Sequence, residues 1–253
     1  WLKALLQGDL GLSYRTGQPV VTMIAQRVVP SLILTGTGVA AAILLGIPLG
    51  VMAAWKPKSG WGKLAGGLTL LSFSAPGFFL CVLVIFLFSV VLGWLPAAGM
   101  YSAGGGGSVG DLLLHLILPA GVVCLSSLGN LVRQTASACG EVLGEDYIRT
   151  ARAKGLPEWA VVWKHGFRTA LLPVVTTILN HIPHIIGGSL IVERIFGWPG
   201  MGSLLFTSVS SRDYTVIMGL TVVIALTVLA TGILMDLVYR LADPGVGWGG
   251  EAR

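Results

Sequence analysis

The chain has 253 residues, of which 54% are hydrophobic and only 11% are charged, and its mean hydropathy is +0.84. A soluble domain carries about 25% charged residues, so this composition predicts a chain that lies in a lipid bilayer. The net charge of +5 would suit nucleic-acid binding, but Lys and Arg lie in short segments between apolar spans, where membrane orientation accounts for them. We therefore expect an all-α, polytopic membrane protein that binds no nucleic acid.

Residues 1–25 are too polar to span a bilayer and contain no signal peptide. The first predicted span follows, from about Val28 to Ala54. Pro30 and Pro48 fall within it, but no charged residue does. The loop after this span carries three lysines, and the positive-inside rule places that loop in the cytoplasm.

Four more spans are expected in the rest of the chain. The second, from about Leu64 to Leu92, returns to the outside and ends in a glycine-rich loop without Lys or Arg. No GxxxxGK motif is present, so this loop predicts a flexible linker rather than a phosphate-binding loop. The third, fourth and fifth spans cover about Leu112–Leu131, Ala170–Val192 and Val216–Tyr239. This order leaves the C-terminus in the cytoplasm.

A charged segment at residues 141–169 separates the third and fourth spans. Asp146 is expected to cap a short helix that ends near Lys154, because Gly155 can adopt the left-handed conformation that terminates a helix. Pro157 suits the first turn of a second helix. The pattern predicts a helix, a tight turn and another helix on the cytoplasmic side.

The second of these helices places Trp159, Val162 and Trp163 at i, i+3 and i+4, on one face. An exposed apolar face of this kind is typical of a surface that binds in a groove. Taken alone, a charge cluster of this kind is usually a solvated loop between helices with ordinary caps, and that alternative stays open here.

The runs DYIRTARAKGL and RTALLPVV closely resemble the cytoplasmic loop of dipeptide, oligopeptide and nickel permease subunits of ATP-binding-cassette (ABC) importers. The general loop of such importers reads EAAxxxG. Aligned on Gly155, this sequence reads RTAxxxG, so Arg149 and Thr150 depart from it, whereas TARAKG is the form of the peptide and nickel branch. The resemblance implies a helix that docks into the ATPase. The implied coupling residues are Asp146, Tyr147, Thr150, Ala151, Arg152, Ala153, Lys154, Gly155, Leu156, Trp159 and Trp163.

Residues 193–214 follow the pattern VExIFxxPGxGxLLxxxxxxRDY, which resembles the external loop before the last helix in the same branch. The resemblance implies a loop that enters the translocation path and faces a binding protein. From the residues alone, an ordinary interfacial turn remains an alternative, with Glu193–Arg194 and Arg212–Asp213 as local ion pairs. The implied gate and binding-protein residues are Glu193, Phe196, Pro199, Gly200, Gly202, Arg212, Asp213 and Tyr214.

The resemblance extends over nearly the whole chain. GWLPAAG and HLILPA match the branch, so residues 26–253 are expected to form the transmembrane domain. The N-terminal pattern WLxxLLxGDLGxSYRTGxPV resembles the external segment after the family's first helix, which implies that the first of six helices is missing upstream. The C-terminal DPGVGWGG departs from the branch, which usually keeps a basic residue there.

His181 and His184 lie three residues apart on the predicted fourth span. Two imidazoles on one helical face suit either a metal ion or a peptide pathway. Because HxxH lacks the further ligands that a metal site needs, we expect no metal here and favour packing hydrogen bonds, with the pathway kept as a candidate role.

The resemblance implies a permease subunit that forms half of a pathway for dipeptides or oligopeptides in a bacterial inner membrane, with nickel or another small solute as the alternative. The implied partners are a second homologous permease, two ATP-binding subunits and an external substrate-binding protein. The chain has no ATP-binding motif, so hydrolysis is assigned to the partners, and no cofactor is expected.

Two other classes of protein compete with this interpretation. An intramembrane protease would need HExxH, a GxSxG nucleophile turn or paired intramembrane aspartates. The sequence contains neither HExxH nor paired intramembrane aspartates, and its one GxSxG string, residues 106–110, lies in the glycine-rich loop rather than in a strand–turn–helix, so no catalytic residue is proposed. A secondary transporter or channel would need enough helices to close a pathway, often in an internal repeat. Five spans without an evident repeat argue against it.

Overall fold

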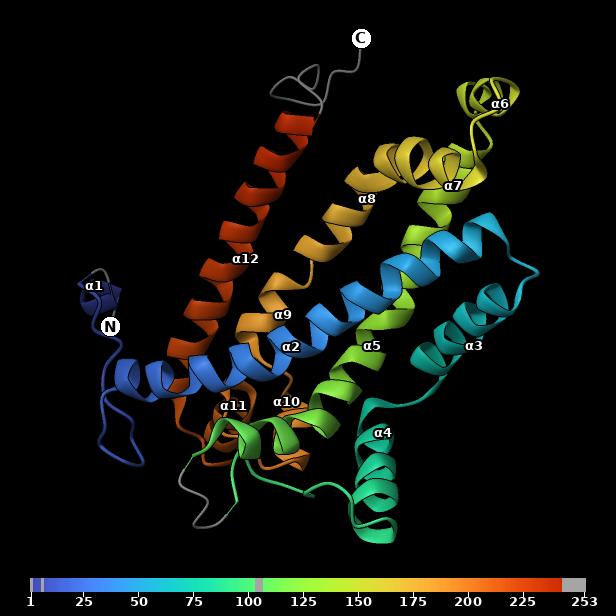
Figure 1. The fold of residues 1–253 in the computed structure, drawn as a ribbon. Helices are drawn as coiled ribbons and strands as arrows, with labels where there is room; N and C mark the ends of the chain where they lie inside the picture. Colours follow the sequence, from blue (N-terminus) through green and yellow to red (C-terminus); the bar gives the residue numbers. More distant parts are fainter. Residues whose placement is uncertain (1, 6, 103–106, 243–253) are drawn as a thin grey trace. The chain divides into compact units, whose positions relative to one another are not determined.

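The structure is a computed structural model that describes residues 2–5, 7–102 and 107–242. Its regular structure is helical, and the one β interaction among the described residues is an isolated antiparallel bridge between Leu12 and Pro19. The helices follow one another in the order labelled in Figure 1. The chain forms two compact units, each built from three segments. The longest helices, which contribute residues to both units, are α2 (Val20–Trp55), α5 (Val109–Leu143) and α12 (Tyr214–Ala242).

Four helical stretches are long and apolar enough to cross a membrane: α2, α5, residues 158–195 and α12. A fifth is obtained when α3 (Gly60–Ser74) is counted with the helical stretch Gly77–Val91 as one interrupted span. Four of the five expected spans are therefore present, and the expected second span corresponds to two helices that meet at a bend of 108°. The helix α2 is longer than the predicted first span, and it continues through both of its prolines without a break.

The second and fourth spans were expected to be continuous, and both are interrupted. The second breaks at Ala75 and Pro76, because a residue before proline disfavours the helical conformation and Pro76 itself is extended, with φ −59° and ψ 135°. The fourth breaks after α8 at Asn180 and His181, and again at Gly188, whose φ is +74°. Its three helices are α8 (Arg168–Leu179), α9 (Ile182–Gly187) and α10 (Leu190–Ile195).

Unit 1 comprises Trp1–Ala40, Ala75–Ser126 and Ile182–Val228. Its core brings the N-terminal segment and the start of α2 against α11 (Met201–Ser210) and the start of α12. This unit also contains α1 (Leu2–Leu5), α4 (Gly77–Val84), the π-helix η1 (Ile85–Val91), α9, α10 and the first part of α5. The buried core residues are Leu10, Val20, Ile24, Met201, Leu204, Val216 and Leu220.

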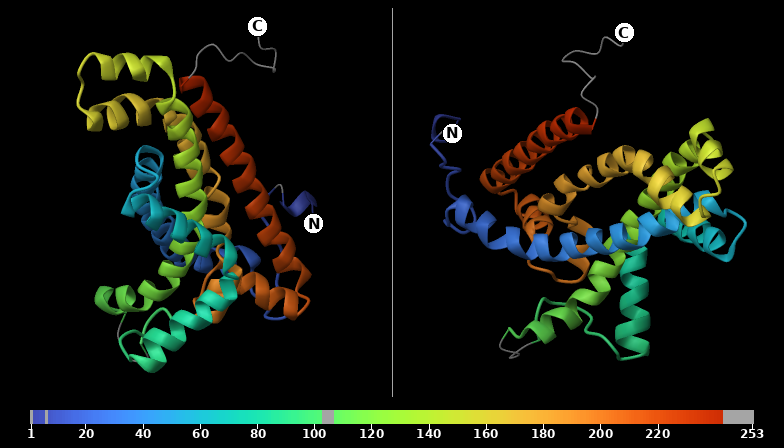
Figure 2. Two further views of the ribbon diagram at one scale, coloured as in Figure 1. Left: turned by 90° about the vertical axis from the view of Figure 1, so that its right-hand side faces the viewer. Right: turned by 45° about the horizontal axis from the view of Figure 1, so that its top comes forward.

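Unit 2 comprises Ala41–Ser74, Ser127–His181 and Leu229–Arg253. Here α2 and α5 approach closely, because a Cβ on Gly50 would lie 2.6 Å from the Cβ of Thr135. The residues after α5 form α6 (Asp146–Ala153), α7 (Glu158–Ala160) and the π-helix η2 (Val161–Phe167). Figure 2 shows α6 lying beside the continuous α7 and η2 segment, with which it packs.

Candidate functional site

The coupling segment, which comprises α6, the turn after it and α7, forms the helix, turn and helix that its sequence predicts. Gly155 has φ +75°, its N–H donates to the Arg152 carbonyl at 2.9 Å, and the Leu156 N–H donates to the Ala151 carbonyl at 3.4 Å. These two bonds close the end of α6 in a Schellman motif. The prediction that Gly155 terminates the first helix is confirmed.

The predicted cap of α6 is wrong. Asp146 is the first helical residue, and Glu145 occupies the N-cap position without a side-chain hydrogen bond. Asp146 instead pairs with Arg149 at 3.1 Å, one turn further along the same helix. An acidic residue in the first turn still interacts favourably with the helix dipole.

One face of α6 packs onto the rest of unit 2. Ile148 is fully buried, and it forms an apolar cluster with Ala151 and with Val161 of η2. Val142 and Leu143, at the end of α5, pack against this cluster. The coupling segment is therefore held on its own apolar base, and Ala151 belongs to that base rather than to the outer face.

The opposite side of the segment is exposed and mixes aromatic, cationic and small residues. Trp159 is 63% exposed and Tyr147 is 45% exposed. A salt bridge of 3.0 Å between Arg152 and Glu158 joins the two helices across the turn. We call this exposed set the outer face; it comprises Tyr147, Thr150, Arg152, Ala153, Lys154, Leu156 and Trp159.

The predicted apolar face of Trp159, Val162 and Trp163 is not formed. Val162 is 1% exposed and lies in a core cluster of unit 2, and the half-buried Trp163 packs against the same cluster. The π-helix that begins at Val161 has a wider turn than an α-helix, so α-helical spacing does not describe these side chains. Of the three, Trp159 alone lies on the outer face.

The second candidate segment, in unit 1, centres on the buried carboxylate of Glu193. One carboxylate oxygen accepts the Ser31 hydroxyl at 2.7 Å, and the other accepts the Ser203 N–H at 2.9 Å. Gly200 and Gly188 leave the space that this carboxylate occupies, because a Cβ on either would collide with it. The sequence suggested an ion pair with Arg194, and the structure contradicts that suggestion.

The turn between α10 and α11 is closely packed. Trp198 is fully buried, and its Nε1–H donates to the Pro30 carbonyl of α2 at 2.8 Å. Phe196 is 2% exposed, and its carbonyl accepts the Gly99 N–H at 2.8 Å. A Cβ on Gly202 would lie 2.6 Å from the Cα of Leu190, so glycine permits the approach of α10 and α11. Pro199 is half-buried in the same turn.

Asp213, at the other end of this loop, also lacks its suggested arginine partner. Its carboxylate accepts the Ser13 hydroxyl and, at 3.2 Å, the Tyr14 N–H. Arg212 is exposed with φ +56°, and Tyr214 is 59% exposed. Burial raises the pKa of the Asp213 carboxyl, but hydrogen bonds from Ser13 and from backbone N–H groups outweigh it, so the pKa lies below its ordinary value of 3.8.

His181 and His184 do not share a continuous helical face. His181 lies in the turn that follows α8, whereas His184 lies within α9. The α-helical hydrogen bonding ends at this point: the Asn180 N–H still donates to the Thr176 carbonyl at 3.1 Å, but the His181 N–H donates to the Ile178 carbonyl at 3.0 Å. Within residues 2–5, 7–102 and 107–242, no group of three or more His, Cys, Asp or Glu side chains is placed to hold a metal ion.

Two serines that support the loop were missed by the sequence analysis. Ser31 lies on an apolar helix and Ser13 in a polar segment, and each is buried against a carboxylate more than 160 positions away. A lone serine carries no pattern that identifies such a partner.

Residues 46–248 match the family described as "Binding-protein-dependent transport system inner membrane component". The chain belongs to this family. It is 42% identical to the oligopeptide transport system permease protein AppB of Bacillus subtilis (strain 168) over 97% of this chain and 78% of that protein. It is 39% identical to the glutathione transport system permease protein GsiC of Pectobacterium atrosepticum, over 97% of this chain and 77% of that protein.

Solved structures share the fold at low sequence identity. An amino acid ABC transporter chain matches with a TM-score of 0.65 at 14% identity, over 87% of this chain and 94% of that chain. A chain of the inward-facing MetNI methionine ABC transporter matches with a TM-score of 0.63 at 17% identity, over 85% and 96% of the two chains. This member of the transport family is therefore a multi-pass membrane subunit with the fold of ABC transporter membrane subunits.

Proposed function

We propose that this chain forms half of the translocation pathway of an ABC importer for dipeptides or oligopeptides. Its partners are a second homologous permease, two ATP-binding subunits and an external substrate-binding protein. ATP is bound and hydrolysed by the partner subunits, so this chain has no cofactor and is not itself an enzyme. The permease AppB, at 42% identity, supports the oligopeptide assignment.

A glutathione pathway is the second candidate, because GsiC is nearly as similar to this chain. Glutathione is itself a short peptide, so both candidates place a peptide backbone in the pathway. Uptake of labelled dipeptide, oligopeptide and glutathione by the assembled system distinguishes them.

The observation that carries the coupling proposal is the outer face of α6 and α7. It exposes Trp159 and Tyr147, while the opposite side is buried on unit 2. A rigid helix with an exposed aromatic residue can insert in a groove and move as a body when that groove moves. We assign the groove to the ATP-binding subunit. The positive-inside rule supports this side as cytoplasmic and the C-terminus with it.

The loop formed by α10, the turn and α11 lies on the external side in this orientation. It presents its buried Glu193 inward and leaves residues such as Arg194, Arg212 and Tyr214 exposed. We assign it to the external gate and to contact with the binding protein. His181 and His184 remain candidates for the pathway.

The proposal is tested with the four-subunit complex purified in mild detergent. Trp159→Ala should weaken retention of the ATP-binding subunits by about thirtyfold, since an exposed tryptophan at an interface centre contributes roughly 2 kcal/mol. Trp94→Ala is the matched control, because Trp94 is 68% exposed but lies in a loop assigned to the outside. In proteoliposomes that contain the same complex, ATP-driven peptide uptake that is indifferent to Trp159→Ala contradicts the coupling role, and uptake without ATP-binding subunits contradicts the importer assignment.

A further inference from the structure

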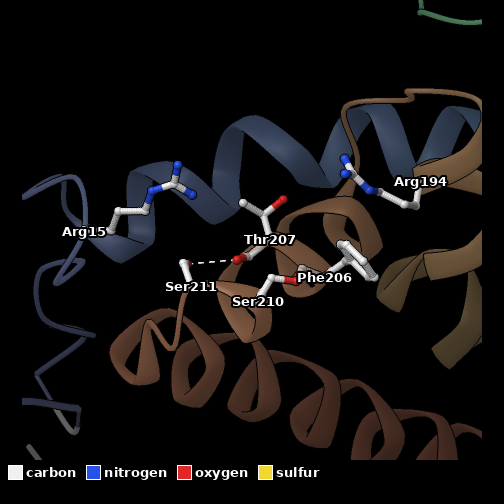
Figure 3. A pocket seen from close by; sticks show the side chains of 6 residues that line it. All are labelled: Arg15, Arg194, Phe206, Thr207, Ser210 and Ser211. Atoms are coloured by element: carbon white, nitrogen blue, oxygen red, sulfur yellow. Dashed lines mark hydrogen bonds between the residues drawn. The ribbon is translucent and has the colours of Figure 1, made fainter.

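An open pocket of about 390 Å³ lies in unit 1, beside the helix α11. Arg15 of the N-terminal segment and Arg194 of α10 border it, and Phe206 and Thr207 of α11 form part of its floor. Figure 3 shows the two guanidinium groups extending from opposite sides toward the face of α11 that carries Thr207. The pocket therefore joins three segments of the chain.

Both arginines extend from backbone that is fixed by buried hydrogen bonds. Next to Arg15, the Ser13 hydroxyl is held by the Asp213 carboxylate and accepts the Arg15 N–H at 3.3 Å. Next to Arg194, the Glu193 carboxylate accepts the Ser203 N–H of α11 at 2.9 Å. The backbone that carries each arginine is therefore anchored beside a buried carboxylate.

The pocket presents positive charge without an internal counter-charge. The ion pairs found among the described residues involve neither Arg15 nor Arg194, and no acidic residue lines the pocket. Arg194 lies over the ring of Phe206, with 4.9 Å from the guanidinium carbon to the ring centroid, which leaves its N–H edge available. A guanidinium edge matches a carboxylate in a bidentate arrangement.

The hydroxyl groups that line the pocket donate their protons within α11. Thr207 donates to the Ser203 carbonyl at 2.9 Å, and Ser210 donates to the Phe206 carbonyl at 2.8 Å. Ser211 donates to the Thr207 carbonyl at 2.8 Å, which Figure 3 marks with a dashed line. Because these protons are used within α11, the arginine N–H groups are the donors that remain for a ligand.

We propose that this pocket binds an acidic side chain, Asp or Glu, of the external binding protein. The inference rests on the proposed function, which places this loop outside the membrane and supplies such a partner. The volume exceeds that of one carboxylate, so it accommodates a protruding side chain with part of its backbone. The exposed position of both arginines favours a partner that arrives from solution over a solute within the pathway.

The test measures the affinity of the purified cognate binding protein for the assembled complex in nanodiscs, at low and high salt. Arg15→Gln together with Arg194→Gln should weaken binding roughly tenfold at low salt, and high salt should reduce that difference, because exposed charge pairs are screened. Each arginine is also changed to glutamine singly. Lys3→Gln is the matched control for these single variants, because it removes one exposed positive charge of unit 1 outside the pocket. Co-purification of the ATP-binding subunits checks that each variant assembles.

The acidic residues of the binding protein are also neutralised one at a time. One of these binding-protein variants should have the same affinity for the wild-type complex as for the Arg194→Gln complex. Unchanged affinity in the double variant overturns the proposal. A loss of affinity with Lys3→Gln that equals the loss with a single arginine variant also overturns it. In proteoliposomes, selective loss of uptake for peptides with a free C-terminal carboxylate, but not for their amides, at unchanged binding-protein affinity assigns the pocket to the substrate instead. If the wild-type complex retains no binding protein or ATP-binding subunit, it is the proposed function that fails.

Discussion

The Ser31 hydroxyl donates a hydrogen bond to the Glu193 carboxylate at 2.7 Å, and its oxygen accepts the Met201 N–H at 2.7 Å. Glu193 is fully buried, and the loop folds around it. Ser31 belongs to α2, and Met201 begins α11. The hydrogen bonds of Ser31 therefore join a long apolar helix to the segment assigned to the external gate.

Glu193→Ala should destabilise the protein by about 3 kcal/mol, because it leaves the Ser31 hydroxyl and the Ser203 N–H buried without their acceptor. Thermal unfolding of the purified complex in detergent measures the effect. Glu145→Ala is the control, since Glu145 is exposed and its side chain makes no capping hydrogen bond. Its expected effect is within about 0.5 kcal/mol. Equal unfolding temperatures for the two variants would show that the buried carboxylate is not structurally important.

Gly155→Ala should lower stability by about 1 kcal/mol, because φ +75° strains any residue with a Cβ. A Cβ there would meet no atom within 4 Å, so the cost arises from the backbone and not from a clash.

Gly140→Ala provides the opposite control in unit 2. Gly140 lies within α5 and also has open space around its Cβ position, so alanine should stabilise the helix by about 0.5 to 1 kcal/mol. Unfolding temperatures that move in opposite directions support the left-handed termination of α6. A gain in stability from Gly155→Ala would contradict it.

The lowered pKa of Asp213 predicts that the stability of the protein depends on pH. Its folded-state pKa is lowered, so the ionised carboxylate contributes stability that is present above the unfolded-state pKa, about 3.8, and is lost as the pH falls through the folded-state value. Wild type should therefore unfold at a higher temperature than Asp213→Asn at neutral pH, and the difference should shrink below a pH of about 3.8.

Ser13→Ala removes the hydroxyl donor to Asp213, and it should reduce the same pH-dependent difference. Thr16→Ala is a suitable control, since the exposed Thr16 makes no contact with the Asp213 carboxylate that the structure records. A difference between wild type and Asp213→Asn that is constant from neutral to acidic pH would contradict the lowered pKa.

Local rules of chain chemistry were enough to predict several features correctly. Apolar runs long enough to cross a bilayer identified four spans and the bent helix pair Gly60–Ser74 and Gly77–Val91, and Gly155 identified the end of α6. Both depend on residues close together in the sequence: burial of a continuous apolar stretch, and the freedom of glycine at positive φ. The family resemblance rests likewise on short contiguous runs.

By itself, then, the sequence determined the class of protein, the order of its spans and the position of the charged segment at residues 141–169. Only the tertiary structure decided that Glu193 and Asp213 bind serines rather than neighbouring arginines, that Val162 is buried, and that the arginines of the pocket lack acidic partners. The reason is physical. A buried polar group needs a partner wherever folding brings one, and the partners here lie 162 and 200 positions away.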